Sequence, residues 1–116
     1  MAGDAYDTLA EFWAIQDGGD YSKLSALFSD DAELIDPIFG RFVGGDAIAG
    51  FMSKMNVEML ARGASFTLVE LAGDDHTAWA QWVATTNGGE RRGVGVYRVS
   101  DGQITYYRDY MNEQGH

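Results

Sequence analysis

The stretch TAWAQWVATTNGGERRGVGVYRVSDGQITYYRDYM, residues 77–111, decides the fold. Apolar or aromatic residues alternate with polar ones in residues 77–86, 90–99 and 103–111, and the turn formers NGG and SDG separate these runs. Alternation between short turns of this kind is typical of consecutive β-strands. A fourth run, SFTLVEL (residues 65–71), precedes them. The second half of the chain therefore predicts a four-stranded antiparallel meander.

The first half of the chain predicts three helices. In residues 6–17, apolar side chains recur at spacings of three and four, which indicates one stripe of a helix. After the breaker DGGD, Asp20 is expected to cap a short second helix that runs to Phe28. The third is expected to start near Asp46 and to stop at Arg62-Gly63, since a cation and a glycine are typical of a helix end.

Between the second and third helices the sequence predicts extended structure. SDD (residues 29–31) predicts a turn, AELID (residues 32–36) a short strand that ends before Pro37, and IFGRFVGG a hairpin segment. Helices followed by a meander indicate one α+β domain over residues 1–116, with three N-terminal helices packed on a curved, mostly antiparallel sheet.

Composition restricts the function. The chain carries a net charge of −10 at pH 7, which disfavours nucleic acid as a partner. It has no cysteine and two histidines, so neither a disulfide nor a histidine metal site is expected, and no cofactor is predicted. The N-terminus MAGDAYD lacks a signal pattern, and no apolar run is long enough to cross a membrane. We expect a cytoplasmic protein.

The period of two in a strand sorts the meander residues by face. One face of residues 90–99 and the matching face of residues 103–111 are expected to carry Gly93, Gly95, Tyr97 and Val99, and Thr105, Tyr107, Asp109 and Met111. If this face meets the helices, the two glycines predict a hollow between sheet and helices rather than a filled core.

Three segments, in this order, carry a family resemblance: FWAIQDGGDYSKLSALFSDDAELIDP, GGDAIAGFM and GQITYYRDYMN. Together they resemble the nuclear transport factor two-like superfamily, in its SnoaL-like and ketosteroid isomerase-like branch. The resemblance spans essentially the whole chain and implies a cone-shaped α+β fold. Relatives of this fold include ketosteroid isomerases, limonene epoxide hydrolases, aromatic polyketide cyclases and non-catalytic binding or dimerisation modules, so the fold alone does not fix the function.

The resemblance gives two aspartates a catalytic precedent. LIDPIFG is similar to the segment that holds the general-base aspartate of ketosteroid isomerases, which places Asp36 there. ITYYRDYMN resembles the segment that carries the water-activating aspartate of epoxide hydrolases, which places Asp109 there. The polyketide cyclases also use a pocket carboxylate as base.

The other catalytic residues of ketosteroid isomerases and epoxide hydrolases have no counterpart in this sequence. Phe12 and Gly95 stand where ketosteroid isomerases need a tyrosine and a protonated carboxyl. Gln81 or Trp82, followed by Val83 or Ala84, stands where epoxide hydrolases need an arginine and an aspartate, depending on the register. The cyclase pattern conflicts least with this sequence.

Each aspartate has two interpretations. Asp36 either caps a turn at the strand end or is a pocket carboxylate with a raised pKa. Asp109 is either paired with an arginine such as Arg41 or Arg91, or is a base on a cavity wall. If both aspartates line one cavity, they form an acid and base pair with coupled titration.

Aromatic and apolar side chains are the candidate ligand-binding residues: Tyr107, Tyr97, Trp13, Trp82, Phe12, Phe39 and Met52. They form either an apolar wall for a planar ligand or simply the core. Tyr107 or Tyr97 is the candidate to support a developing oxyanion.

The opposite face of the meander predicts an interface. It carries Val94, Val96, Arg98, Tyr106, Arg108 and Tyr110, and surfaces rich in tyrosine and arginine mark protein contacts. We expect a homodimer through this sheet face. The sequence as a whole predicts a cofactor-independent isomerase or cyclase that acts with a pocket aspartate on a small apolar carbonyl compound. The alternative is a non-catalytic ligand-binding or dimerisation module on the same fold.

Overall fold

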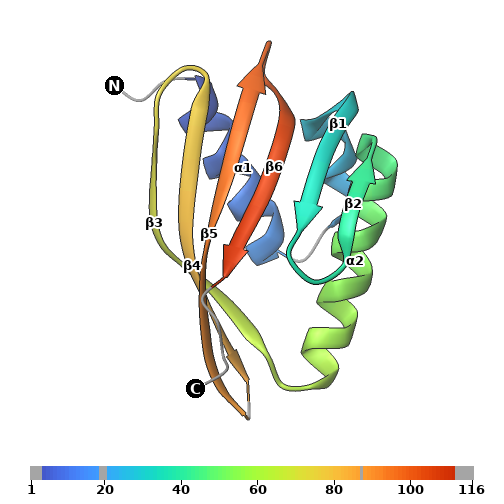
Figure 1. Ribbon diagram of the computed structural model, residues 1–116, viewed down its shortest axis with the longest axis vertical. Helices are drawn as coiled ribbons and strands as arrows, with labels where there is room; N and C mark the ends of the chain where they lie inside the picture. Colours follow the sequence, from blue (N-terminus) through green and yellow to red (C-terminus); the bar gives the residue numbers. More distant parts are fainter. Residues whose placement is uncertain (1–3, 19–20, 87, 112–116) are drawn as a thin grey trace.

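A computed structural model of the chain describes residues 4–18, 21–86 and 88–111 (Figure 1). Its elements are, in chain order, helix α1 (Asp4–Gly18), the short 3₁₀ helices η1 (Tyr21–Lys23) and η2 (Ser25–Leu27), strands β1 (Phe28–Asp36) and β2 (Gly40–Val43), helix α2 (Gly45–Ala61), and strands β3 (Ser65–Gly73), β4 (Thr77–Thr86), β5 (Gly89–Ser100) and β6 (Gln103–Met111). The α+β class is confirmed.

The six strands form one sheet in the order β2-β1-β6-β5-β4-β3. Strands β3 to β6 make the predicted antiparallel meander, and β1 and β2 the predicted hairpin. The two units join where β1 runs parallel to β6, with Leu34 opposite Tyr107 and Ile35 opposite Arg108. This parallel pair is therefore the seam between the two halves of the chain.

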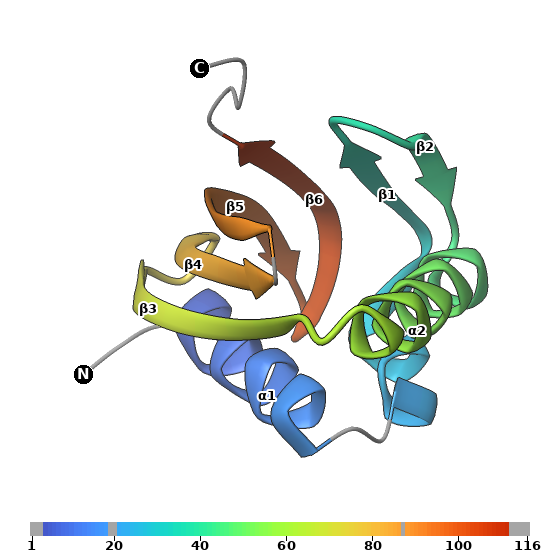
Figure 2. The ribbon, with the colours of Figure 1, turned by 90° about the horizontal axis from the view of Figure 1, so that it is seen from below.

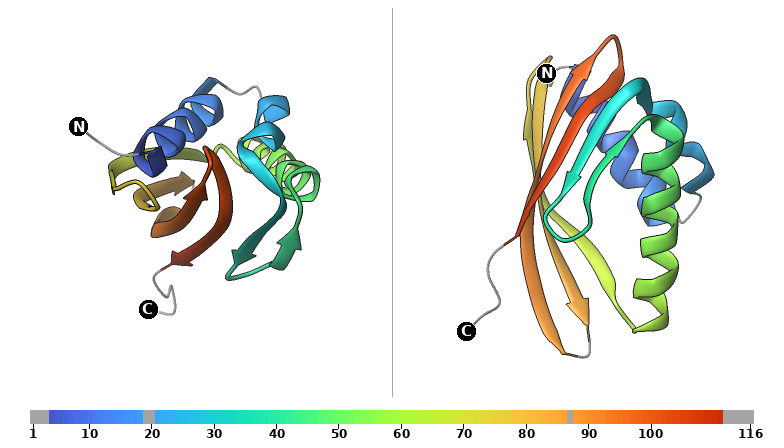
Figure 3. Two further views of the ribbon diagram at one scale, coloured as in Figure 1. Left: turned by 90° about the horizontal axis from the view of Figure 1, so that it is seen from above. Right: turned by 45° about the vertical axis from the view of Figure 1, so that its right-hand side comes forward.

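Both α-helices lie on the same side of the curved sheet (Figures 2 and 3). Helix α1 packs on the meander strands β3, β4 and β5, and α2 packs on β1 and β2. In the described part of the chain, neither helix combines the length and the apolar character that crossing a membrane requires.

The prediction of three N-terminal helices is wrong in two respects. The second helix is replaced by the two 3₁₀ helices η1 and η2, and α2 is mid-chain rather than N-terminal, although it occupies the residues predicted for it. The predicted cap, Asp20, falls outside the described residues. The predicted turn at residues 29–31 belongs to β1 instead, in an irregular stretch between Phe28 and Glu33 of the pairing with β6. Pairing of the flanking residues Phe28 and Glu33 with β6 keeps these polar residues extended despite their local turn preference.

The end of α2 agrees with the prediction. Gly63 follows the C-cap residue Arg62 with a φ of 73°, a conformation that glycine adopts without steric cost. The backbone N–H of Ala64 then donates to the carbonyl of Met59 at 2.8 Å, which satisfies one of the last helix carbonyls. The chain thereby turns from α2 directly into β3.

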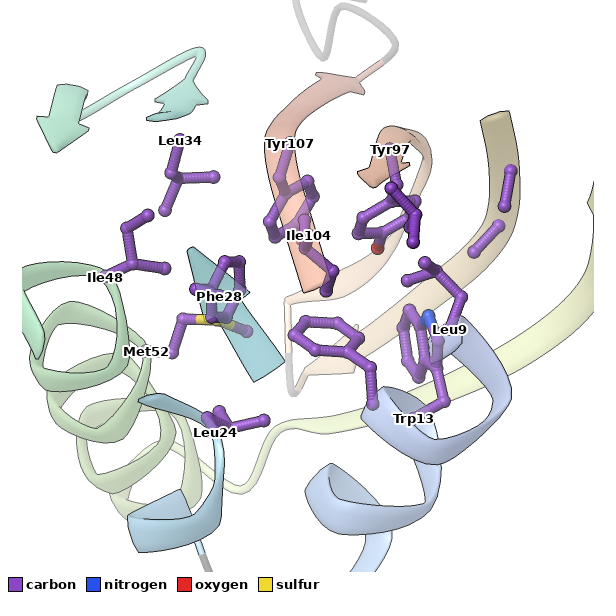
Figure 4. Close-up of a cluster of buried hydrophobic side chains, with 14 of the residues drawn as sticks. Leu9, Trp13, Leu24, Phe28, Leu34, Ile48, Met52, Tyr97, Ile104 and Tyr107 are labelled. Carbon is purple, nitrogen blue, oxygen red and sulfur yellow. The ribbon is translucent and has the colours of Figure 1, made fainter. Parts of the chain in front are cut away.

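The core is centred on Phe12 of α1. Its ring meets Trp13, Phe28, Tyr97 and Tyr107 edge-on, with centroid separations of 5.6 to 6.3 Å. Figure 4 shows these side chains converging from α1, β1, β5 and β6. For Phe12, the interpretation as a core residue is therefore the right one.

The predicted face of β5 is confirmed, but the predicted hollow over its glycines is wrong. Gly93 and Gly95 are buried on the helix side. A Cβ on Gly93 would lie 2.2 Å from Cζ2 of Trp82, and one on Gly95 would lie 2.7 Å from the Tyr97 hydroxyl. The glycines thus make room for two aromatic rings that lie across the strand.

Strand β6 departs from strict alternation at one residue. Ile104 lies opposite Val99, and Tyr106 lies opposite Arg98, so Thr105 is the extra residue of a β-bulge. Ile104 therefore takes the buried position that alternation predicts for Thr105, whose hydroxyl donates to the Arg98 carbonyl at 3.3 Å. Beyond the bulge, Tyr107, Asp109 and Met111 keep the predicted face.

Candidate active site

A cavity of about 600 Å³ opens between the sheet and the helices. Most of the candidate residues line it: Asp36, Asp109, Tyr107, Trp13, Trp82, Phe39 and Met52. Phe12 and Tyr97 do not, which corrects their prediction as ligand-binding residues. Both are completely buried in the packed core, because Phe12 is enclosed by four rings and Tyr97 lies beneath Tyr107.

Asp109 lies on the cavity wall, held by two neutral donors. The Tyr107 hydroxyl donates to its Oδ2 at 2.9 Å, and Nε1 of Trp82 donates to its Oδ1 at 3.3 Å. The predicted alternative, an ion pair with Arg41 or Arg91, is not found among the described residues, where Arg41 pairs with Glu33. Asp109 is thus oriented by hydrogen bonds without a neutralising cation.

The surroundings make Asp109 a stronger base than an ordinary aspartate. Burial, the largest effect, raises its pKa from 3.8 to about 7. The hydrogen bonds from Tyr107 and Trp82 act in the opposite direction and lower this pKa, and the charge of Asp36 raises it further. A carboxyl with a pKa near neutrality exchanges protons readily in both directions at physiological pH.

Asp36 caps a turn, as the first of its two interpretations predicts. Its Oδ1 accepts hydrogen bonds from the backbone N–H groups of Ile38 and Phe39, at 2.8 and 2.9 Å. It therefore caps the turn after Pro37, as an aspartate before a β-turn commonly does. The same residue lines the cavity. Its turn-capping role accounts for its position without any catalytic function.

The β1–β6 seam brings the two aspartates to one place. Leu34 and Tyr107 are register partners with buried side chains, and the next inward positions on the two parallel strands are Asp36 and Asp109. The negative charge of Asp36 raises the pKa of Asp109. Both carboxylates thus line one cavity through a parallel pairing that the sequence did not predict.

The two tyrosines considered for an oxyanion are placed for other contacts. Tyr107 and Tyr97 stack with their ring centroids 4.4 Å apart, and the Tyr107 hydroxyl is directed to Asp109. Burial, followed by the charge of Asp109, raises the pKa of both hydroxyls well above the usual value, so both stay protonated. Figure 4 shows the Trp13 indole beside Tyr97, and Nε1 of Trp13 has no hydrogen-bond partner among the described residues.

Several polar residues on the cavity wall were not predicted, and Gln16 is one of them. Nε2 of Gln16 is buried and has no hydrogen-bond partner among the described residues, and Gln16 lines the cavity. An unsatisfied buried donor is costly and calls for a partner. The sequence did contain a signal, because Gln16 follows Phe12 and Trp13 by four and three residues and so interrupts the apolar stripe of α1.

The strand register resolves which residues of β4 face the cavity. Trp82 and Ala84 line it. Of the two registers considered in the sequence, the structure therefore has the one in which Trp82 and Ala84 face inward. In the described residues no three histidine, aspartate or glutamate side chains are grouped to hold a metal ion.

Comparison with protein families gives one match, and it covers most of the chain. The family model of the SnoaL-like domain matches residues 9–107. No curated protein matches the sequence significantly.

Several solved structures share the fold at low identity. An NTF2-like protein of unknown function from Mesorhizobium loti superposes with a TM-score of 0.82 at 22% identity, over 95% of this chain and 92% of the other. A steroid delta-isomerase from Pseudomonas aeruginosa gives 0.80 at 19%, over 98% and 83%. An LEH-like epoxide hydrolase from M. tuberculosis gives 0.72 at 22%, over 94% and 83%. These similarities concern the fold.

Proposed function

Because the chain belongs to the SnoaL-like domain family, and because its cavity holds a basic carboxylate, we propose that it is a small cofactor-independent enzyme of the isomerase or cyclase kind. Asp109 is the proposed general base. The substrate is a small, largely apolar carbonyl compound, since most of the cavity lining is apolar, chiefly aromatic rings and methionines.

The observation that carries the proposal is the setting of Asp109. Each of its two carboxylate oxygens accepts one hydrogen bond from a neutral donor, and no described cation neutralises it. Two rigid aromatic donors fix the orientation of the carboxylate, and carboxylate oxygens retain further lone pairs for a substrate proton. A buried aspartate with a structural role alone would be expected to have a cationic partner or a full set of donors.

The proposed reaction begins with proton transfer from carbon. Asp109 takes a proton from the carbon next to the substrate carbonyl, and the electron pair of that C–H bond moves toward the carbonyl oxygen to form an enolate. The now neutral Asp109 returns the proton to a different carbon in an isomerisation. In a cyclisation, the enolate carbon first bonds to a second carbonyl carbon of the same molecule, and the proton goes to the resulting alkoxide.

The enolate oxygen needs a hydrogen-bond donor, and Gln16 is the proposed one. Gln16 lines the cavity and its buried side-chain nitrogen has no partner among the described residues, whereas the Tyr107 hydroxyl is already engaged by Asp109. A donor placed before reaction, where negative charge develops, lowers the barrier because it needs no reorganisation. Burial keeps the pKa of Asp109 high, and the charge of Asp36 adds a smaller increase.

The proposal can be tested without knowledge of the natural substrate. In D₂O, the acidic α-hydrogens of 2-tetralone exchange for deuterium whenever a base removes them, and ¹H NMR follows the loss of their signals. We expect the protein to accelerate this exchange and Asp109→Asn to reduce the rate to that of the buffer. Asp46→Asn, an exposed change in the first turn of α2 outside the cavity, is the matched control and should retain the full rate.

The same experiment separates an enzyme from a binding module. If wild-type protein binds 2-tetralone, as seen in its indole N–H resonances, but does not accelerate exchange, this simple ketone is not turned over. If a panel of apolar ketones gives the same result, the cavity serves binding without chemistry, and the proposed enzymatic role of Asp109 is refuted.

A further inference from the structure

Two arginines line the same cavity as the proposed base. Arg62 is the C-cap residue of α2, and Arg91 lies on β5 just after the β4–β5 turn. In the described part of the chain, neither arginine takes part in an ion pair. The whole protein has only eight basic residues against eighteen acidic ones, so two unpaired arginines in one cavity require an explanation.

The fold places both arginines at one end of the molecule. Arg91 shares the inward parity of Gly93 and Gly95 and lies opposite Ala84, which also lines the cavity. Figures 1 and 3 show the β4–β5 turn and the C-terminal end of α2 at the same end of the fold. Both arginine residues are exposed, as expected for the mouth of a cavity rather than its interior.

The other charged groups that line the cavity do not neutralise this pair. Glu90 forms its own ion pair with Arg92 at 3.5 Å. Asp36 accepts the two backbone hydrogen bonds of its turn, and Asp109 accepts those of Tyr107 and Trp82. Between Asp109 and the arginines the wall is mainly apolar, with Met55, Met59 and Met111 among its residues.

The separation between base and arginines can be estimated along β5. Asp109 lies opposite Gly95, and Arg91 lies four residues further along that strand. At roughly 3.3 Å per residue, this is about 13 Å along the strand. A ligand that reaches both sites therefore has an elongated apolar body.

We propose that the ligand of this cavity is amphiphilic: its apolar body lies against the methionines and aromatic rings, and a terminal anionic group is bound by Arg62 and Arg91 at the mouth. A guanidinium binds a carboxylate, sulfonate or phosphate equally well by paired hydrogen bonds, so the shared property is the negative charge. The idea that the apolar end of the ligand reacts at Asp109 rests on the proposed function. The binding of the anionic group by the two arginines does not depend on it.

A pair of fluorescent probes of similar shape tests the proposal. 1-Anilinonaphthalene-8-sulfonate carries an anionic group, and N-phenyl-1-naphthylamine is its neutral counterpart. The three tryptophans report where each probe binds: Trp13 and Trp82 line the cavity, and Trp79 is 38% exposed on the opposite face of the sheet. Affinities are therefore taken from the indole N–H shifts of Trp13 and Trp82 in ¹⁵N spectra, and shifts of Trp79 alone mark binding outside the cavity.

We expect Arg62→Gln/Arg91→Gln to weaken cavity binding of the sulfonate about tenfold and to leave the affinity for the neutral probe unchanged within twofold. The matched control is Lys23→Gln/Lys54→Gln, which removes the same number of positive charges from exposed positions that do not line the cavity. It should leave both affinities unchanged, apart from a small effect of net charge that added salt removes.

Three results would overturn the proposal: equal loss of sulfonate binding in the lysine control, equal loss of the neutral probe in the arginine variant, or sulfonate shifts at Trp79 alone. None of these results bears on whether Asp109 is a base, which hydrogen exchange of 2-tetralone tests separately. Conversely, if Asp109 does not catalyse hydrogen exchange, a selective loss of sulfonate binding in the arginine variant still supports an anion site.

Discussion

Tyr107 donates a hydrogen bond of 2.9 Å from its hydroxyl to Oδ2 of Asp109, two residues further along the same face of β6. The contact joins a protonated phenol to the carboxylate whose pKa burial raises to about 7. Because a strand sets the spacing of residues i and i+2, the donor and the acceptor are positioned by a single element.

Loss of the Tyr107 donor should make Asp109 harder to ionise. The hydrogen bond lowers the pKa of Asp109, so Tyr107→Phe is expected to raise that pKa further, by about one unit if the bond is worth about 1.5 kcal/mol. Carboxyl ¹³C chemical shifts followed across pH measure this. Tyr106→Phe removes the same hydroxyl from the neighbouring position on the opposite face, and should leave the titration of Asp109 unchanged.

The raised pKa of Asp109 predicts a distinct pH dependence of stability. Between about pH 4 and pH 7 the folded protein holds a proton at Asp109 that the unfolded chain has lost, so the free energy of unfolding falls as pH rises through this window. Below about pH 4, Asp109 is protonated in both states and its contribution to the free energy of unfolding is at its maximum. Above about pH 7, it is ionised in both states, and burial of the charge lowers the free energy of unfolding by the full amount.

Asp109→Asn removes this cost. We expect the variant to be more stable than wild type at pH 8, by about 1 to 2 kcal/mol after allowance for partial solvent access, and to lose the advantage near pH 4. Urea unfolding at both pH values measures it. A gain that is the same at pH 4 and pH 8 would contradict the assignment. Ketone exchange should show the opposite trend, rising with pH to a plateau above about 7.

Gly93 should be required for the position of Trp82. A Cβ at this residue would lie 2.2 Å from the indole ring, which is rigid and cannot yield at its edge. Gly93→Ala is therefore expected to displace the indole N–H from Asp109 and to destabilise the protein by about 1 to 3 kcal/mol. The indole resonance of Trp82 and thermal unfolding measure the two effects.

Gly50 provides the control for that change. It is an exposed glycine of α2, and a Cβ there would meet nothing within 4 Å. Gly50→Ala is expected to stabilise the protein, by up to about 1 kcal/mol, because alanine favours a helix. Similar destabilisation by both substitutions would show that Gly93 has no special relation to Trp82.

The two roles of Asp36 can be separated by two substitutions. Asp36→Asn keeps an oxygen that accepts the N–H groups of Ile38 and Phe39 but removes the charge, so it should lower the pKa of Asp109 with little change in stability. Asp36→Ala should also lower that pKa, and in addition cost about 1 kcal/mol because the turn loses its cap. Titration and urea unfolding distinguish them; an unchanged Asp109 titration in both would exclude the electrostatic coupling.

We propose that the outer sheet face forms a homodimer. Trp79 and Tyr110 are exposed there, and Arg98 and Arg108 lie over the rings of Tyr106 and Tyr110 at 5.0 and 5.1 Å. Light scattering at micromolar concentration should give twice the monomer mass of 12.7 kDa. Trp79→Lys should yield monomers, whereas Val57→Lys, at an exposed position of α2, should not. A monomeric wild type would refute the proposal.

Much of the fold follows from local patterns in the sequence. The meander is predicted because short turns join adjacent strands, and Asp101-Gly102 shows why: both residues have positive φ and close a two-residue hairpin. The end of α2 at Gly63 is predictable for a similar reason. The strand through residues 29–31 is not, because β1 is held on both sides of them by pairing of Phe28 and Glu33 with residues of β6 more than 70 positions away.

The site is predictable in its carboxylates but not in its donors. Asp109 and Asp36 stand out because charged residues interrupt apolar strands. The partners of Asp109 depend on ring orientations that alternation does not specify, and Gly93 gives the Trp82 indole the room to reach it. Tyr97 has the same strand parity as the cavity residues, yet it is covered by Tyr107. Alternation in the sequence predicts on which face of the sheet a side chain lies, but it does not predict how deeply that side chain is buried.

The parallel seam between β1 and β6 has a consequence for the order of folding. The meander closes through neighbouring hairpins, whereas the seam joins Phe28 to Ile104 and must wait until β6 exists. During synthesis, the β1–β2 hairpin therefore emerges long before its partner strand and carries Asp36 without Asp109 nearby. We expect the cavity to be completed only when this long-range pairing forms, so that ligand binding reports on completed folding of the whole domain.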